Sequence, residues 1–513
     1  MSDTHGAGAG AGREVELKLA IGSDAARSAA DRELGRAPAR SVETIYYDTP
    51  RRRLHSAGYS LRLRRDGEKW SQSVKSADGF NRFEQDHPLR GAMPDFSLLE
   101  GTPIASLVDV ADGLSPMFVT RVQRRSRRRD ADGSRIEYSL DEGEVIAADR
   151  SWPILELELE LKAGAPGALF DQGRRLARDE AFVPAFMSKA DRGYALVDGI
   201  LGEPVKFGAH KLDDRMSAAA AFQTLARRCL RQLSLNADLI GSGWRLEALH
   251  QARTALRRLR VAMKLFEPLL AKPRTEAIEA ELKWLTGELA DARNLDVLVL
   301  ETFQPVADKL ADRAAAAAFG KALLAAQERG HERAREALAS PRFRLMLLDA
   351  ARWVEGCGEP AEPALIARAQ GAFAADFAAR ALAARRKALC KRIEDLDWGD
   401  PFARHKVRIA AKKMRYASEF FLGLGPKSRS GRYRPFVEAL SEMQDKLGRL
   451  NDLSVAETMI LHTLEAALDT RDGAQRIGYA AGVVMGRNLA HSDKLARSAR
   501  RASRAFADTP VWW

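Results

Sequence analysis

Short segments in which charged and apolar residues alternate carry the side chains most suited to chemistry. Residues 14–19 read Glu-Val-Glu-Leu-Lys-Leu, and residues 156–161 read Glu-Leu-Glu-Leu-Glu-Leu. A β-strand turns successive side chains to opposite faces, so each segment places its charges on one face. Crowded carboxylates repel one another unless a cation lies among them, and their hard oxygen atoms suit Mg²⁺ or Mn²⁺. Together the segments predict a divalent-metal site, whereas either one alone also fits a solvated edge strand.

Other alternating segments place basic residues on the same kind of face. Arg62 and Arg64 alternate with leucine, Lys75 ends the next such segment, and Arg82 lies near the start of another. A guanidinium group matches phosphate oxygens two at a time. Because acids and bases lie on different strands, the charged face is unlike an ordinary solvated surface. Metal-binding acids beside a basic wall predict a site for a phosphoanhydride substrate.

One basic position depends on the register of its strand. Strict alternation from Thr120 turns Arg124 inward, whereas a single bulge would bring in Arg121 or Arg125 instead. We predict that Arg124 is the inward residue. The arginine-rich residues 125–129 have the composition of a solvated loop.

About eight alternating segments fill the first two hundred residues, which is enough strands for a barrel. They cover residues 14–19, 43–50, 59–64, 70–75, 81–89, 118–124, 134–141 and 154–162. After residue 215 the pattern changes to long Ala/Leu/Arg-rich segments, which predict helices as far as the C-terminus. The chain is therefore expected to be an α+β multidomain protein.

The motifs of the first part, in their order, resemble the CYTH superfamily, the triphosphate tunnel metalloenzymes. The resemblance covers about 195 residues and rests on the two acidic segments, the Leu-Arg-Leu-Arg run, the strand end at residues 47–49 and the closing residues 188–194. It implies an eight-stranded antiparallel barrel with flanking helices. Its charged interior would bind a triphosphate and a divalent metal, and a metal-held water would attack the terminal phosphate.

The resemblance also implies roles for individual side chains. Those implied to be catalytic are Glu14, Glu16 and Lys18. Those implied to bind Mg²⁺ or Mn²⁺ are Glu14, Glu16, Glu156, Glu158 and Glu160. Those implied to hold the triphosphate are Lys18, Arg62, Arg64, Lys75, Arg82, Arg124, Lys189 and Arg192. One of the carboxylates would orient or deprotonate the attacking water, and the spacing leaves open which one.

The second part of the chain contains a duplicated segment. Residues 249–260 align with residues 404–415, and in both copies basic residues follow a histidine by three, seven and ten positions. These positions lie on one side of an α-helix. The first stripe is His250, Arg253, Arg257 and Arg260, and the second stripe is His405, Arg408, Lys412 and Arg415. Because no series of acids compensates these charges within either helix, the stripes predict two anion-binding surfaces.

A second duplicated segment follows each stripe, and the two copies also differ. Residues 289–297 align with residues 447–455, and we expect these segments to link the helices of each half. Glu419 stands where the first copy has Lys264, so the second stripe is shorter by one charge.

The duplicated pattern resembles the CHAD domain, a helical domain that is often joined to a CYTH domain. This resemblance spans about residues 210 to 510. It implies two related helical bundles that bind inorganic polyphosphate. The expected order is a flexible tail (residues 1–12), a tunnel domain (13–198), a linker (199–215) and a helical domain (216–508) with halves of about 216–355 and 365–508.

The composition indicates the cellular compartment and the class of partner. The 513 residues carry a formal charge of +12, which implies an anionic partner. Three widely spaced cysteines predict no disulfide framework and favour the cytoplasm. No apolar run is long enough to cross a membrane. Since no aromatic residue lies on the stripes, we expect no specific nucleic-acid partner.

These expectations combine into one function with two alternatives. The leading hypothesis is a cytoplasmic inorganic triphosphatase that cleaves triphosphate to diphosphate and phosphate, with a helical domain that binds polyphosphate and can locate the enzyme on polyphosphate granules. One alternative is a tunnel that acts on an organic triphosphate, such as thiamine triphosphate or a nucleoside triphosphate. The other is a non-catalytic polyphosphate-binding adaptor.

Overall fold

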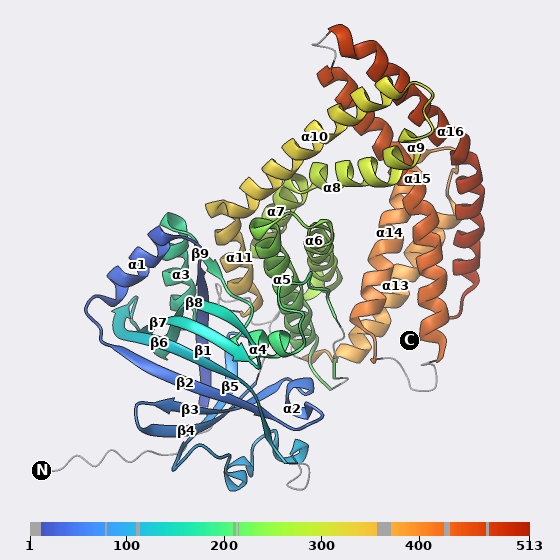
Figure 1. Cartoon of the computed structure of the whole chain (residues 1–513). Helices are drawn as coiled ribbons and strands as arrows, with labels where there is room; N and C mark the ends of the chain where they lie inside the picture. Colours follow the sequence, from blue (N-terminus) through green and yellow to red (C-terminus); the bar gives the residue numbers. More distant parts are fainter. Residues whose placement is uncertain are drawn as a thin grey trace, which may run out of the picture. The chain divides into compact units, whose positions relative to one another are not determined.

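The chain divides into two compact units (Figure 1). The tunnel unit comprises Met1–Val205 and Ala339–Glu359, and the helical unit comprises Lys206–Leu338 and Pro360–Trp513. The computed structural model describes residues 12–76, 79–108, 113–208, 212–213, 215–356, 371–424, 431–467 and 471–513. The expected flexible tail therefore lies outside the described residues, apart from its last residue.

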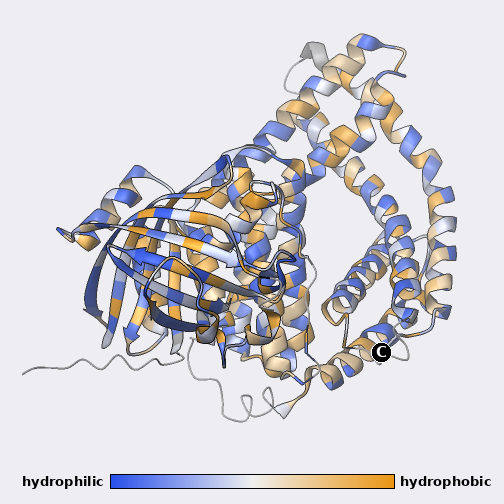
Figure 2. Ribbon diagram, turned by 60° about the horizontal axis from the view of Figure 1, so that its bottom comes forward, coloured by the Kyte–Doolittle hydropathy of each residue, from blue (hydrophilic) through white to orange (hydrophobic). Residues whose placement is uncertain are grey.

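The tunnel unit is built on one antiparallel sheet that closes on itself. Its strands are β1 (Gly12–Ile21), β2 (Ala39–Asp48), β3 (Tyr59–Asp66), β4 (Lys69–Ser76), β5 (Asn81–Leu89), β6 (Ser115–Ala131), β7 (Ser134–Ala147), β8 (Arg150–Ala163) and β9 (Phe182–Pro184). The order is β5-β4-β3-β2-β6-β7-β8-β1-β9, and a further pairing of β5 with β1 closes the barrel. The eight long strands confirm the predicted barrel, and Figure 2 shows hydrophilic and hydrophobic residues alternating along them.

Helices and short turns flank the barrel. They are α1 (Asp24–Leu34), α2 (Arg53–Ser56), the 3₁₀ turns Phe96–Leu99 and Ala105–Leu107, α3 (Gly167–Asp179), α4 (Lys189–Val197) and α11 (Pro341–Val354). Ser188 and Asp191 form a capping box at the start of α4, which fixes the direction in which this helix leaves the barrel.

Strand β1 completes the barrel because its successive parts have different partners. Residues 12–15 pair with β5, and residues 16–20 pair with β8. This register sets Glu14 opposite Arg82 and Lys18 opposite Glu158. On the other face of β1, Leu17 is fully buried beneath α3.

Strand β6 is longer than expected, because the arginine-rich residues 125–129 continue the strand and do not form a solvated loop. Arg128 donates a hydrogen bond to Glu137 of β7 at 2.9 Å. Arg125 and Arg129 form ion pairs with acids of α1. Pairing partners therefore overcome the repulsion among the arginines and keep them in the sheet.

Helix α11 packs on α3, although the sequence repeat groups it with the first helical half. Leu348 of α11 is fully buried. A Cβ atom on Gly173 of α3 would lie 3.2 Å from Leu348 and 2.7 Å from Leu17, so glycine lets α3 approach both side chains without displacing their methyl groups. Arg344 Nε also donates to the Ala177 carbonyl at 3.1 Å.

The helical unit consists of long helices from both halves of the repeat. They are α5 (Ala218–Ser242), α6 (Leu246–Phe266), the 3₁₀ turn Glu267–Leu269, α7 (Lys272–Glu288), α8 (Ala290–Val297), the π-helical turn η4 (Leu298–Phe303), α9 (Gln304–Ala307), α10 (Arg313–Ala339), α13 (Ala374–Glu394), α14 (Pro401–Phe420), α15 (Tyr433–Ala467) and α16 (Arg471–Asp508). Within the described residues, no helix combines the length and the apolarity needed to cross a membrane.

Equivalent helices of the two halves meet at their junction. The first stripe lies on α6 and the second stripe on α14, and these helices contact each other. The second duplicated segments lie on α8 and α15, which are also in contact. Phe266 and Phe421, at equivalent positions, have ring centroids 6.0 Å apart, and Phe377 packs against both rings. The duplication thus places both stripes beside one junction.

We expect Leu348→Ala to lower the free energy of unfolding of the tunnel unit by about 2–5 kcal/mol, because it leaves a cavity between α11 and α3. Calorimetry or urea unfolding of the full chain measures the change. Leu324→Ala is the matched control, since Leu324 is 56% exposed, and it should change stability by less than about 0.5 kcal/mol. Equal effects of the two substitutions would contradict the docking of α11.

Candidate active site

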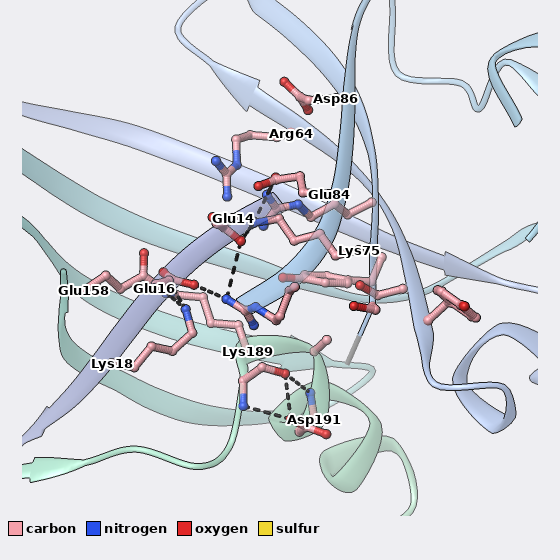
Figure 3. A pocket seen from close by; sticks show the side chains of 18 of the residues that line it. Glu14, Glu16, Lys18, Arg64, Lys75, Glu84, Asp86, Glu158, Lys189 and Asp191 are labelled. Atoms are coloured by element: carbon pink, nitrogen blue, oxygen red, sulfur yellow. Dashed lines mark hydrogen bonds and ion pairs between the residues drawn. The ribbon is translucent and has the colours of Figure 1, made fainter. Parts of the chain in front are cut away.

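The barrel encloses a charged cavity of about 270 Å³ (Figure 3). Eleven of the thirteen side chains predicted for the tunnel line it. They are Glu14, Glu16, Lys18, Arg62, Arg64, Lys75, Arg82, Arg124, Glu158, Glu160 and Lys189. The alternating strands bring these residues together because their charged faces all turn inward.

The other two predicted residues, Glu156 and Arg192, do not line the cavity. Glu156 is fully buried and accepts a hydrogen bond from Arg192 at 2.6 Å. It also forms an ion pair with Lys189, which does line the cavity. Glu156 therefore positions Lys189, which lines the cavity, although Glu156 itself does not.

The acids of β1 are paired with bases of the neighbouring strands. Lys75 Nζ lies 2.8 Å from Glu14, and Arg82 pairs with both Glu14 and Glu16. Burial raises the pKa of Glu14, but Lys75 and Arg82 outweigh burial and hold the pKa below its usual value. Glu14 is consequently ionised at neutral pH.

Glu158 lies at the centre of a second group of paired charges. Its carboxylate is 2.6 Å from Lys18 and from Arg124 and 2.7 Å from Lys189. Burial would raise the pKa of Glu158, but these three cations hold it well below its usual value. The absence of a bulge between residues 119 and 125 of β6 turns Arg124 inward, as predicted.

Asp141 belongs to the same group, although it was not among the predicted site residues. Its carboxylate and those of Glu156 and Glu158 bring oxygen atoms within 4.8 Å of one another. Lys189 Nζ lies 2.6 Å from Asp141, and Arg124 Nε donates to Asp141 at 2.6 Å. The alternation of β7 places Asp141 on the charged face, but only the pairing with β8 sets it opposite Glu156.

Glu160 lies where the carboxylates are least compensated. It stands opposite Glu16 in the β1–β8 ladder. Burial raises the pKa of Glu160, Glu14 and Glu16 raise it further, and the ion pair with Lys162 at 2.5 Å only partly opposes them. The carboxylate oxygens of Glu14, Glu16 and Glu160 repel one another, and a divalent cation such as Mg²⁺ or Mn²⁺ would offset this repulsion.

Arg64 differs from the other cavity bases because it has no carboxylate partner. Arg62 and Lys75 both pair with Glu84, at 3.2 and 2.9 Å. Arg64 makes no ion pair with any described residue, and its Nε is buried without a hydrogen-bond partner. Arg62, burial and Arg124 together lower the pKa of Arg64 to about 10. Such a crowded guanidinium is a ready site for an anion (Figure 3).

The charges of the whole lining are balanced. Seven carboxylates face seven lysine and arginine side chains around the cavity. Buried charges are stable only when they are paired in this way. A polyanion that enters therefore brings excess negative charge, which an accompanying cation would offset.

Other cavity residues were also missed by sequence reasoning. Glu84 and Asp86 of β5 extend the acidic lining, and Ser73 donates to Asp86 at 2.5 Å. Glu84 lay on the predicted charged face, and Asp86 continues the same alternation two residues later.

An aromatic group lines the same cavity and comes from segments far apart in the sequence. Its members are Tyr46, Tyr59, Tyr194 and His55. His55 stacks on Tyr194 with ring centroids 3.9 Å apart. Asp48 positions both residues, since it accepts hydrogen bonds from the His55 amide at 3.0 Å and from the Tyr194 hydroxyl at 2.8 Å. The strand end at residues 47–49 thus shapes the site.

The helical unit has its own basic cavity, of about 420 Å³, between α6 and α14. Four of the eight stripe residues line it, namely His250, Arg257, Lys412 and Arg415. The remaining four make other contacts: Arg253 donates to the Thr286 carbonyl at 3.3 Å, Arg260 lies 3.9 Å from Glu279, Arg408 lies 3.7 Å from Asp452, and His405 is hydrogen-bonded to Asn451 at 2.5 Å.

Lys412 shows that charge in this cavity is undercompensated. Burial, Arg257 and Arg408 lower the pKa of Lys412 to about 7, against the smaller opposing effect of Asp452. Glu419, the acid that departs from the first copy, pairs with Arg258 across the junction at 2.6 Å. Glu419 therefore connects the two halves of the helical unit. Because Arg258 balances its charge, the cavity stays basic.

Comparison with known proteins finds two matched regions. Residues 12–194 match the CYTH domain, and residues 224–461 match the CHAD domain. An inorganic triphosphatase of Haemophilus influenzae is 30% identical over 195 residues, which are 36% of this chain and 55% of that protein. The match thus spans about half the length of this curated relative.

Two solved structures resemble the chain over more than half of its length. The crystal structure of the CHAD domain from the plant Ricinus communis is similar with a TM-score of 0.50 and 28% identity, over 59% of this chain and 96% of that one. PptA from Streptomyces chartreusis is similar with a TM-score of 0.44 and 20% identity, over 56% of this chain and 99% of that one.

We expect Glu160→Gln to raise the melting temperature of the tunnel unit in metal-free buffer near neutral pH. A carboxylate whose pKa is raised in the folded state destabilises the fold above that pKa, and glutamine removes its charge. Mg²⁺ or Mn²⁺ should then stabilise the wild type more than the variant, as differential scanning calorimetry would show. Glu68→Gln, at an exposed turn, is the control. Equal stabilisation of Glu160→Gln and wild type by metal would contradict a role for Glu160 in metal binding.

Proposed function

From a chain that carries a CYTH domain over residues 12–194 followed by a CHAD domain over residues 224–461, we propose a triphosphatase joined to a polyphosphate-binding module. The tunnel unit would hydrolyse inorganic triphosphate to diphosphate and phosphate with Mg²⁺ or Mn²⁺. The helical unit would bind inorganic polyphosphate. The match to the inorganic triphosphatase covers 55% of that protein. The proposed substrate is therefore argued from the residues that line the cavity.

The unpartnered guanidinium of Arg64 carries the proposal for the tunnel. It lines the cavity beside Arg62, and Arg124 adds to the positive potential. Phosphate oxygens would give Arg64 the charge-assisted hydrogen bonds that the described residues do not supply. Carboxylates line the same cavity, so a phosphate chain on the basic wall would lie beside the acids.

Glu14, Glu16 and Glu160 are the residues that would hold the metal on the acidic side. A bound divalent ion would lower the pKa of a water molecule and offset the charge of the triphosphate. Glu156 is better suited to positioning Lys189, because it pairs with Lys189 and Arg192 and does not line the cavity.

Lys18 would act as a fixed cation between the two sets of acids. Its ammonium group lies 2.7 Å from Glu16 and 2.6 Å from Glu158. Burial lowers the pKa of Lys18, but Glu158 and Glu16 outweigh burial and raise it above its usual value. Lys18 would therefore donate hydrogen bonds to phosphate oxygens and not accept a proton from water.

An organic triphosphate is the second candidate substrate, and the aromatic group favours it. His55 is exposed while its ring stacks on Tyr194, so one face of the cavity lining could contact a base or a thiazolium ring. No comparable aromatic contact is needed for inorganic triphosphate. The two substrates are therefore separable by experiment.

The deciding experiment measures phosphate release from inorganic triphosphate, ATP and thiamine triphosphate with Mg²⁺ or Mn²⁺. We expect inorganic triphosphate to give the highest kcat/KM and Glu16→Ala to abolish the activity. A higher kcat/KM for ATP or thiamine triphosphate that falls selectively in His55→Ala would establish the organic substrate. No release from any of the three substrates would favour the non-catalytic adaptor.

Arg64→Gln should lower kcat/KM for triphosphate by about 10- to 1,000-fold, because it removes a cation that faces the substrate. Arg65→Gln is the matched control on the same strand. Arg65 is 50% exposed and pairs with Glu43 outside the cavity, so its loss should change kcat/KM less than about twofold. Equal effects of the two substitutions would refute the assignment of Arg64 to the substrate.

The polyphosphate proposal for the helical unit rests on cations of both stripes around one cavity. Arg257 and Lys412 come from different copies of the repeat, and each raises the positive potential at the other. A linear polyanion would relieve this repulsion along the junction. Reversing the charge at Arg253, Arg257, Arg408 and Lys412 should abolish polyphosphate retention and leave triphosphate hydrolysis intact.

Polyphosphate affinity should fall as the pH rises through about 7, where free Lys412 loses its proton. A bound polyanion favours the charged amine, so binding above that pH requires proton uptake. Lys412→Arg keeps its charge and should remove this dependence. Binding isotherms between pH ~6 and pH ~9 check the effect. If Lys412→Arg keeps the same pH dependence of polyphosphate affinity, that dependence comes from another titratable group.

A further inference from the structure

A second cavity of about 580 Å³ lies in the helical unit, away from the stripe residues. It is lined by η4 and α9 of the first half and by α15 and α16 of the second half, which come together in Figure 1. Four long basic side chains line it, Lys446 and Arg449 from α15 and Arg487 and Lys494 from α16. None of the four forms an ion pair with any residue in the described part of the chain.

The acids of this cavity do not compensate those cations. Glu301 lies 4.0 Å from Arg293, and Asp452 lies 3.7 Å from Arg408. Both acids are thus engaged by arginines outside the cavity lining. Lys446 and Arg449 are three residues apart on one helix, where like charges repel, and Glu442 and Asp445, four residues before each of them, form no ion pair with either base among the described residues. An anion in the cavity would remove this repulsion.

The repeat shows that these cations replace acids. Residues 289–297 align with residues 447–455, so Arg449 corresponds to Asp291, and one turn earlier Lys446 corresponds to Glu288. Asp291 has a structural partner, since Arg333 donates to it at 2.9 Å. The two copies therefore differ in sign at these positions, and the two bases of the second copy form no ion pair within the described residues.

We propose that this cavity is a second site for inorganic polyphosphate, which makes the helical unit select long chains over short ones. The inference rests on the proposed binding of polyphosphate at the stripes. Arg408 of the second stripe contacts Asp452, which lines the second cavity, so one long chain can reach both sites. Linked occupancy of two sites raises affinity without any new contact at either site.

Polyphosphate fits the lining better than a nucleic acid. The cavity is lined by aliphatic, polar and charged residues, and apart from the imidazole of His491 no aromatic ring is among its described lining residues. Nonspecific binding of single-stranded nucleic acid relies on bases that stack on aromatic rings. A polyphosphate chain needs only the cations.

The test compares two variants of equal charge in the full-length protein. Lys446→Glu with Arg449→Asp introduces the acids that the first copy has at the equivalent positions. Arg434→Glu with Arg476→Glu makes the same change in net charge at exposed positions of α15 and α16 outside the cavity. Arg487→Glu with Lys494→Glu tests the cavity independently from α16, and circular dichroism checks that each variant is folded.

We expect the cavity variants to weaken long-chain polyphosphate binding at least about tenfold relative to the charge-matched control, with a shallower salt dependence. Short-chain binding and triphosphate hydrolysis should change less than about twofold. Long-chain affinity equal to that of the control would overturn the second site, as would selective loss of single-stranded RNA binding.

If the helical unit does not bind polyphosphate at all, the outcome differs from the one expected when only the second site is absent. Wild type would then bind no polyphosphate of any length, which would overturn both proposals. If wild type binds, and Arg257→Glu with Lys412→Glu weakens short and long chains alike while the cavity variants match the control, only the second site fails.

Discussion

The repulsion among like charges held close together is the constraint on which both units depend. In the tunnel unit, closure of the barrel through β1 forces the charged faces of successive strands into one enclosed space. Buried charges of one sign would unfold such a barrel, so acids and bases must face each other across it. Lys18 shows this balance, since its ammonium group pairs with both Glu16 and Glu158.

The two units meet the same constraint differently, and this difference suits different ligands. The tunnel lining is balanced in formal charge, so a compact polyanion enters only with a compensating cation. In the helical unit cations of both copies lie together, and burial, Arg257 and Arg408 lower the pKa of Lys412. Undercompensated cations of this kind favour an anionic ligand, and this is the basis of the polyphosphate proposal.

Duplication explains how the helical unit became asymmetric. Equivalent helices meet at the junction, so a substitution in one copy acts on the other copy. Glu419 replaces the equivalent of Lys264 and pairs with Arg258 of the first half. Lys446 and Arg449 stand where the first copy has Glu288 and Asp291, and they form no ion pair within the described residues. The difference at residue 419 strengthens the junction, and the differences at residues 446 and 449 create local positive charge.

The sequence by itself determined which side chains share a face. Alternation with period two assigned Glu14, Glu16 and Lys18 to one side of β1 and turned Arg124 inward, and the helical period gathered each stripe. These are local properties, because a strand or helix sets the direction of each side chain from its neighbours in the chain. The barrel and the helical repeat followed from the same patterns.

The tertiary structure alone decided which charges become partners. Lys189 reaches Asp141 and Glu158 from the start of α4, so Glu156 supports a lysine and lies outside the lining. His55 and Tyr194 stack on each other, and Asp48 accepts hydrogen bonds from the His55 amide and the Tyr194 hydroxyl. Such pairings depend on strand register, barrel closure and helix docking, which join residues far apart in the chain. Local periodicity carries no information about those distances.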